Sequence, residues 1–152
     1  MIFIPGNVPS SKNSKVKCAK GVFNSPAVRK YLQFIGVKKY GKDYVENYKT
    51  RPNLFDTPEL RIELQGEYPL IVGFHFVRKT KGRWDFHNLC QVICDLLVAH
   101  GMILDDDIDH LIPIPMVVSG KVWTKDKNKP GVWVKVLPDY DLPHAEWFEV
   151  KK

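Results

Sequence analysis

The segment from Asp85 to Asp109 constrains the fold of this chain most, because it combines a clear helical period with a concentration of carboxylates. Its apolar residues recur at the spacing i, i+3, i+4, i+7 and i+8, which predicts an amphipathic helix. These apolar residues are Leu89, Val92, Ile93, Leu96 and Leu97. Asp85 stands where an N-cap is expected, and Gly101 supplies a stop signal. The segment therefore predicts one helix, followed by a turn and an acidic loop.

One flank of this predicted helix is polar. At about 100° per residue, four polar residues fall on one arc beside the apolar face. They are His87, Asn88, Gln91 and Asp95. The sequence thus predicts a row of hydrogen-bonding and metal-binding groups along the helix.

Three adjacent aspartates, Asp105, Asp106 and Asp107, follow the helix. Neighbouring carboxylates repel one another unless a cation or basic groups neutralise them. If the loop folds back, they come close to the polar flank of the helix. Oxygen ligands of this kind favour Mg²⁺ or Mn²⁺. A divalent metal site is the functional interpretation, and a solvated acidic loop is the alternative.

The charge of the chain is unevenly distributed. The formal net charge is +6, and residues 1–50 contain ten Lys or Arg residues against two acidic residues. Residues 81–110, in contrast, contain two basic residues against six aspartates. A basic protein attracts polyanions such as nucleic acids. A carboxylate cluster within a basic protein is the combination expected of a metal-dependent nuclease, in which the protein holds the polyanion and the metal assists its cleavage.

The length of 152 residues and the hydrophobic content of 44% fit one globular domain spanning residues 1–152. No apolar segment of the sequence reaches the roughly 18 residues that a membrane span requires. The apolar N-terminus precedes its lysines, the reverse of a signal peptide, and the three cysteines show no disulfide spacing, so a cytoplasmic protein is expected. Cys90, Cys94 and His87 could bind zinc, but a fourth ligand has no obvious source, and core cysteines are the favoured interpretation.

Outside this segment, strands are expected at residues 2–4, 22–23, 68–78, 112–118 and 132–137. The last two are expected to form a hairpin through a lysine-rich loop, and two prolines place the first of them at a sheet edge. Ser25 and Pro26 predict the start of a basic helix. Residues 10–20 are expected to form a basic loop, residues 50–58 a connection, and residues 138–152 an irregular tail.

The spacing of the acidic residues resembles the signature of the RusA-like Holliday-junction resolvases, DNA endonucleases frequently encoded by phages and prophages. That family shows Asp-x-Asp-Asn, then a helical run with a lysine and a further Asp, then a Gly followed closely by an Asp-Asp pair. The matching positions here are Asp85, Asn88, Asp95, Gly101, Asp105 and Asp106. The N-terminal IPGNVPSSKNSK and the later SPAVRKYL are also similar to the family, so the resemblance covers residues 2–40 and 68–118.

Two positions depart from the family pattern: its second Asp is His87 here, and its helical lysine is Gln91. A neutral histidine can still bind a divalent metal, and it would shift the preferred ion towards Mn²⁺. Gln91 cannot supply the positive charge with which a lysine would stabilise the reacting phosphate. Turnover would therefore fall unless Lys12, Lys81 or Arg83 compensates.

The resemblance implies an α+β domain with a mixed sheet of four to five strands and two main helices. It also implies a Mg²⁺-dependent endonuclease, with Mn²⁺ as a second option, that resolves Holliday junctions or related branched DNA in recombination and repair and acts as a homodimer. The implied catalytic residues are Asp85, His87, Gln91, Asp95 and Asp106, and the implied metal ligands are Asp85, His87, Asp95, Asp105 and Asp106. The DNA phosphates would be bound by Lys12, Asn13, Lys15, Lys17, Lys20, Arg29, Lys30, Lys81 and Arg83.

Two other hypotheses remain open. His87 and Gln91 motivate a branched-DNA-binding accessory protein that keeps the scaffold and has lost turnover. The third hypothesis is an unrelated protein whose acidic loop is a solvated surface. The basic residues that flank the acidic centre argue against this third hypothesis and do not separate the first two.

Overall fold

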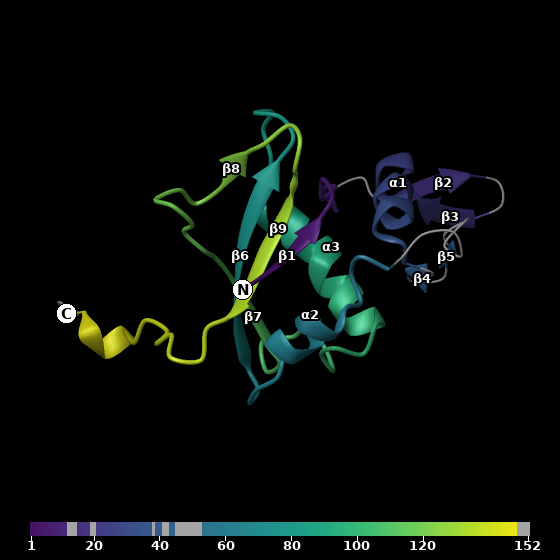
Figure 1. Ribbon diagram of the computed structural model, residues 1–152. Coiled ribbons are helices and arrows are strands. Elements are labelled where there is room, and N and C mark those ends of the chain that lie inside the picture. Colours follow the sequence, from purple (N-terminus) through teal and green to yellow (C-terminus); the bar gives the residue numbers. More distant parts are fainter. Residues whose placement is uncertain (12–14, 19–20, 38, 41–42, 45–52, 149–152) are drawn as a thin grey trace.

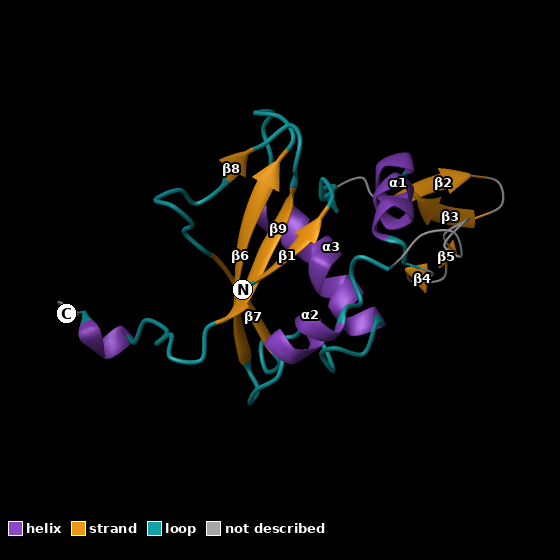
Figure 2. Ribbon diagram, viewed as in Figure 1, coloured by secondary structure: helices purple, strands orange, loops and turns teal. Residues whose placement is uncertain are grey.

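The computed structural model describes residues 1–11, 15–18, 21–37, 39–40, 43–44 and 53–148, and it describes side chains for residues 1–11, 25–37 and 53–148. These residues form an α+β fold with an open, mixed sheet of five strands and three α-helices (Figures 1 and 2). The α+β class and the four to five strands expected from the sequence are confirmed, and one short helix is added to the two expected helices.

The described strands form one main sheet and two separate hairpins. The main sheet contains β1 (Ile2–Pro5), β6 (Leu70–Arg78), β7 (Leu111–Pro115), β8 (Thr124–Lys125) and β9 (Gly131–Val136). Two separate hairpins pair β2 (Lys15–Cys18) with β3 (Gly21–Asn24) and β4 (Lys39–Tyr40) with β5 (Asp43–Tyr44). The helices are α1 (Pro26–Ile35), α2 (Pro58–Glu63) and α3 (Phe86–Ala99).

Strand β6 is the centre of the main sheet. Strand β9 pairs with one edge of β6 in the antiparallel direction, and β1 pairs with the outer edge of β9. Strands β7 and β8 pair with the other edge of β6 in the parallel direction. The parallel pair β6 and β7 is connected through α3, which lies across one face of the sheet (Figure 1). This crossover positions the acidic segment relative to the sheet.

The expected hairpin between residues 112–118 and 132–137 is wrong. The observed strands β7 and β9 lie on opposite edges of β6 and do not pair with each other. The physical reason is that β7 and β9 satisfy the backbone N–H and C=O groups of both edges of β6, one edge each, whereas a hairpin of β7 with β9 would leave one edge of β6 unpaired. The edge position expected from Pro113 and Pro115 is confirmed, because β7 stands last in the strand order.

The side chains of β6 alternate between two buried faces. Leu70, Val72, Phe74 and Phe76 belong to the main hydrophobic core, together with residues of α1, α2 and α3. His75 points to the other face, where its ring nitrogens lie 2.9 Å from the carbonyl oxygen of Met116 and 2.8 Å from Oγ1 of Thr124. The connection between β7 and β8 therefore covers the second face of β6, which explains why this strand is buried on both faces and largely apolar in sequence.

Helix α1 begins as the sequence predicts. Oγ of Ser25 accepts a hydrogen bond of 3.4 Å from the backbone N–H of Val28, and Pro26 occupies the first turn. The same signal starts α2, where Oγ1 of Thr57 accepts from the N–H of Leu60 at 3.2 Å. Helix α2 was not predicted, because its six residues are too few to show an apolar period.

Two other expectations concern irregular segments. The basic loop expected at residues 10–20 is wrong in part, because Lys15–Cys18 form strand β2. The tail after β9 is irregular as expected, apart from the 3₁₀ turn Ala145–Trp147, and it extends away from the sheet as far as it is described (Figure 1). No helix within the described residues is long and apolar enough to cross a membrane.

Candidate functional site

The start of α3 is fixed by one acidic cap and one aromatic contact. Oδ1 of Asp85 accepts a hydrogen bond of 2.9 Å from the backbone N–H of His87, which satisfies one of the free donors in the first turn. The ring of Phe86 packs edge-on against Phe76 of β6, with 5.8 Å between the ring centroids. The role of Asp85 as an N-cap, one of the two interpretations of the sequence, is thus observed.

The N-terminal segment is held against the first turn of α3. The backbone N–H of Ser11 donates to the carbonyl oxygen of Asn88 at 3.0 Å, and Oγ of Ser11 lies 3.4 Å from Oδ1 of Asn88. These residues are 77 positions apart, so no local sequence pattern could show the contact. Consequently, Ser11, the last described residue before the basic N-terminal segment, lies beside the polar flank of α3.

Gln91 connects α3 to the acidic loop that follows it. Its side-chain Nε2 donates a hydrogen bond of 2.6 Å to Oδ1 of Asp95, one turn further along the helix. The same nitrogen lies 3.4 Å from Oδ2 of Asp106. The left-handed backbone of Gly101, with φ of 68°, reverses the chain after the helix and allows this approach. The fold-back expected from the sequence therefore brings Asp106 to the middle of α3.

The five proposed metal ligands are not brought to one point. An α-helix rises about 1.5 Å per residue, so Asp85 lies about 15 Å and His87 about 12 Å from Asp95 along α3. Two oxygens that bind the same Mg²⁺ lie at most about 4 Å apart. Across residues 1–11, 25–37 and 53–148, no three His, Cys, Asp or Glu side chains are arranged so that they could hold a metal ion. The structure gathers only Asp95 and Asp106 around a common group, the amide of Gln91.

The other two aspartates of the triplet make local contacts. Oδ1 of Asp105 accepts from the backbone N–H of Asp106 at 2.7 Å. Oδ1 of Asp107 lies 2.6 Å from Nδ1 of His110. This hydrogen bond lowers the pKa of Asp107 and raises the pKa of His110, which the negative charges of Asp107, Asp105 and Asp109 raise further. Sequence reasoning missed His110, although the i, i+3 spacing from Asp107 was a visible signal.

Cys90 and Cys94 lie in the hydrophobic core with exposed fractions of 3% and 5%. Burial raises the pKa of the Cys90 thiol, and the charge of Cys94 adds to the effect. Burial also raises the pKa of the Cys94 thiol to about 12, with smaller contributions from Asp106 and Asp95. Zinc binds the thiolate form, so two thiols held protonated in the core favour the structural interpretation of these cysteines over a zinc site.

The predicted phosphate-binding residues occupy different places. Arg29 and Lys30 are exposed on α1, and Lys81 and Arg83 are exposed on the loop between β6 and α3. Lys12, Asn13 and Lys20 lie outside the described residues, and Lys15 and Lys17 lie in β2, whose side chains are outside them as well. Sequence reasoning did not assign a role to the exposed lysines of the long connection from β7 to β9, which are Lys121, Lys125, Lys127 and Lys129.

No protein-family model matches this chain, and no curated protein matches it significantly.

Proposed function

We propose that this protein is a metal-dependent endodeoxyribonuclease that cuts Holliday junctions or related branched DNA. The observation that supports the proposal most is the convergence of Asp95 and Asp106, from two different elements, on the side chain of Gln91. Carboxylates held close together from two elements are the oxygen ligands that a divalent cation prefers in proteins.

The donor set of this pair fits Mg²⁺ or Mn²⁺. A magnesium ion in a phosphoryl-transfer site commonly takes one or two protein carboxylates, several waters and oxygens of the substrate phosphate. Asp95 and Asp106 would provide the carboxylates, and each has a second oxygen besides the one that faces Gln91. When bound there, the ion would lower the pKa of a water molecule and neutralise charge on the phosphodiester.

The neighbouring side chains have separate tasks in this proposal. Gln91 fixes the orientation of both carboxylates through its amide hydrogens. His87 lies one turn earlier on the same flank, where its exposed ring would hydrogen-bond to DNA rather than join the same ion. Asp85 positions the helix as its N-cap.

The basic residues around this flank would hold the DNA backbone. Lys81 and Arg83 lie on the loop directly before α3, and Ser11, which precedes Lys12 in the sequence, lies at the first turn of the helix. Contacts of lysine and arginine with phosphates are independent of base sequence and weaken with salt. We include a homodimer in the proposal, because paired cuts on a four-way junction need two sites related by a two-fold axis.

A second function, binding of branched DNA without cleavage, is favoured by Gln91 itself. A glutamine leaves the site without the positive charge that would stabilise the reacting phosphate. The contacts that hold DNA would be the same in both functions, so binding alone does not separate them.

Metal binding tests the proposed site without relying on cleavage. Mn²⁺ binding to the purified protein can be followed by electron paramagnetic resonance, with wild type compared to Asp95→Asn and Asp106→Asn in the presence of DNA. The proposal expects Mn²⁺ affinity to fall by about tenfold or more in each variant, since each removes one of two carboxylate ligands. Asp109→Asn is the matched control, because Asp109 is exposed on the same loop and the amide of Gln91 faces Asp95 and Asp106 instead. Equal Mn²⁺ binding in all four proteins would refute the site.

A further inference from the structure

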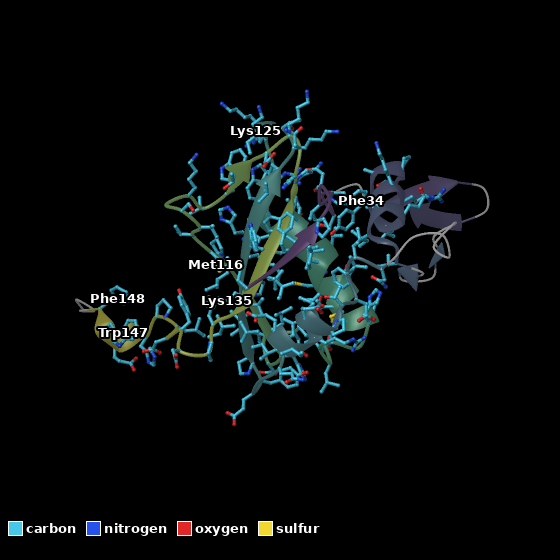
Figure 3. All side chains as sticks on the ribbon, viewed as in Figure 1. Phe34, Met116, Lys125, Lys135, Trp147 and Phe148 are labelled. Carbon is cyan, nitrogen blue, oxygen red and sulfur yellow. The ribbon has the colours of Figure 1, made fainter. Side chains whose placement is uncertain are left out.

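A groove of about 790 Å³ runs between α1, the loop after β1 and the loop before β9, away from the carboxylates of the α3 flank. Its floor includes the rings of Phe3, Tyr31 and Phe34. Phe34 has an exposed fraction of 43%, although it is large and apolar. Figure 3 shows Phe34 projecting from α1 towards the main sheet. An aromatic ring that is held in place and left accessible can stack on another flat ring.

The position of Phe34 is fixed by the backbone beneath it. A Cβ atom added to Gly6 would lie 2.9 Å from Cδ1 of Phe34 and 3.0 Å from Cε2 of Tyr31. Only a glycine therefore allows both rings to pack on the loop after β1. On the far side of the groove, Phe3 packs against Trp133 with 4.8 Å between ring centroids. The aromatic floor is thus supported from two sides and is built before any ligand arrives.

Four exposed lysines stand around this floor. Lys30 comes from α1, Lys79 from the loop after β6, and Lys127 and Lys129 from the loop before β9. None of the four forms an ion pair within the described part of the chain. The nearby Asp126 uses its Oδ1 to accept the backbone N–H groups of Asn128 and Lys129, which shapes their loop. The ammonium groups of these lysines therefore repel one another unless an anion binds in the groove.

We propose that this groove binds an unpaired segment of single-stranded DNA, with a base stacked on Phe34 and the phosphates on the surrounding lysines. Proteins that bind single strands combine a basic groove with aromatic side chains in this way, because every base has a face that can stack. In a duplex the base faces are covered by their neighbours. An acidic peptide would match the lysines and would leave the aromatic floor without a partner of its own kind.

The groove is continuous with the proposed nuclease site along the chain. Ser10 lines the groove, and the next residue, Ser11, bonds to Asn88 in the first turn of α3. A strand that leaves the groove in this direction would reach the polar flank of the helix. This path from the groove to the helix is the part of the inference that rests on the proposed function. The feature of branched DNA that the protein would recognise is an unpaired strand beside the junction.

Binding in EDTA tests the groove separately from cleavage, because no metal is needed. Fluorescence anisotropy of a labelled oligothymidine would be measured with the full chain of wild type, Phe34→Ala and the double variant Lys127→Ala/Lys129→Ala. We expect Phe34→Ala to weaken binding about fivefold or more through lost stacking. The double variant should lower the slope of log affinity against log salt by about 1.4, since about 0.7 counterion is released per phosphate of a single strand.

Two exposed residues outside the groove provide matched controls. Lys135→Ala removes a lysine on β9 near the other end of the sheet from Lys125, and Trp147→Ala removes an exposed aromatic ring of the tail (Figure 3). Both should bind oligothymidine as wild type does. The lysine variants alter exposed side chains only, so they remain informative if Phe34→Ala lowers the melting temperature.

Three results would overturn the inference. The first is an unchanged affinity in both Phe34→Ala and the double lysine variant. The second is a matched duplex that binds as tightly as oligothymidine and loses affinity equally in these variants. The third is a competition in which poly-glutamate and unlabelled oligothymidine, at equal charge, displace the labelled oligothymidine equally well. That result would identify an acidic chain as the partner. Cleavage assays in Mg²⁺ are a separate measurement, so failure of the groove and failure of the nuclease are distinguishable.

Discussion

Nε2 of Gln91 lies 3.4 Å from Oδ2 of Asp106, so the middle of α3 contacts the loop that follows the helix. The same nitrogen donates to Asp95 at 2.6 Å. In the RusA-like pattern that the sequence resembles, a lysine stands at this position. The structure therefore puts the most consequential departure from that pattern between the two carboxylates that the proposal assigns to the metal.

Replacing Gln91 is the first prediction. The double variant His87→Asp/Gln91→Lys should increase Mg²⁺-dependent cleavage of a four-way junction by about tenfold or more, because an ammonium group beside the phosphate stabilises the charge of the transition state. The rate would be measured in single-turnover reactions with a labelled junction. His87→Asp/Gln91→Met is the matched control, since methionine has a similar length and no charge. Equal rates for the lysine variant and wild type would show that neither position limits cleavage.

The pair of His110 and Asp107 predicts a pH dependence of stability. The folded pKa of His110 is raised, so its contribution is full below the unfolded value of about 6.5 and is lost as pH rises through the folded pKa. The folded pKa of Asp107 is lowered, so its contribution is present above about 3.9 and is lost as pH falls through its folded pKa.

The difference in melting temperature between wild type and His110→Gln should therefore be largest between about pH 4 and pH 6.5. It should decrease above neutral pH. Thermal unfolding followed by circular dichroism from pH 4 to pH 8 would measure it, and an NMR titration of the His110 ring would check the direction of its pKa directly. A difference that is constant across this range would show that the two side chains do not interact in solution.

Gly131 lies where β1 pairs with β9, and the sheet should not tolerate a side chain at this position. A Cβ atom at this position would lie 2.5 Å from the carbonyl oxygen of Ile4 and would also clash with the ring of Phe3. The backbone of an adjacent strand cannot move aside, so Gly131→Ala should lower the free energy of unfolding by about 1 to 3 kcal/mol in urea denaturation.

Gly82→Ala is the control for that experiment. Its Cβ atom would lie 3.4 Å from Oγ1 of Thr80, an ordinary contact on an exposed loop. The free energy of unfolding should change by less than about 0.5 kcal/mol. If both alanine variants are as stable as wild type, the described packing of β1 on β9 is incorrect.

Local signals in the sequence predicted the two longer helices well. Helix α3 follows from the apolar period and from Asp85 and Gly101, and α1 follows from Ser25 and Pro26. The partners of β7 and β9 could not be predicted in this way. Both strands pair with β6, and the choice between β6 and a hairpin is decided by contacts distant in sequence. Nearness along the chain favoured a hairpin, whereas in the structure β6 lies between the two strands.

The candidate site shows the same division. The contact of Gln91 with Asp95 follows from the i, i+4 spacing of one helix. The approach of Asp106 needed the turn at Gly101, which the sequence suggested without specifying the residue that would be reached. The wide separation of Asp85 from Asp95 could be calculated from the rise per residue of an α-helix. The contact of Ser11 with Asn88, in contrast, depends on the whole fold.

Cleavage of a labelled four-way junction, compared between wild type and Asp106→Asn, tests the proposed nuclease most directly. With Mg²⁺ or Mn²⁺, the account predicts paired cuts by wild type that disappear in EDTA and fall by about 100-fold or more in Asp106→Asn, because one of two metal-binding carboxylates is lost. Asp109→Asn on the same loop should cut as wild type does, and a linear duplex should be cut far more slowly. Tight binding of the junction without cuts in any metal, or undiminished cutting by Asp106→Asn, would contradict the account.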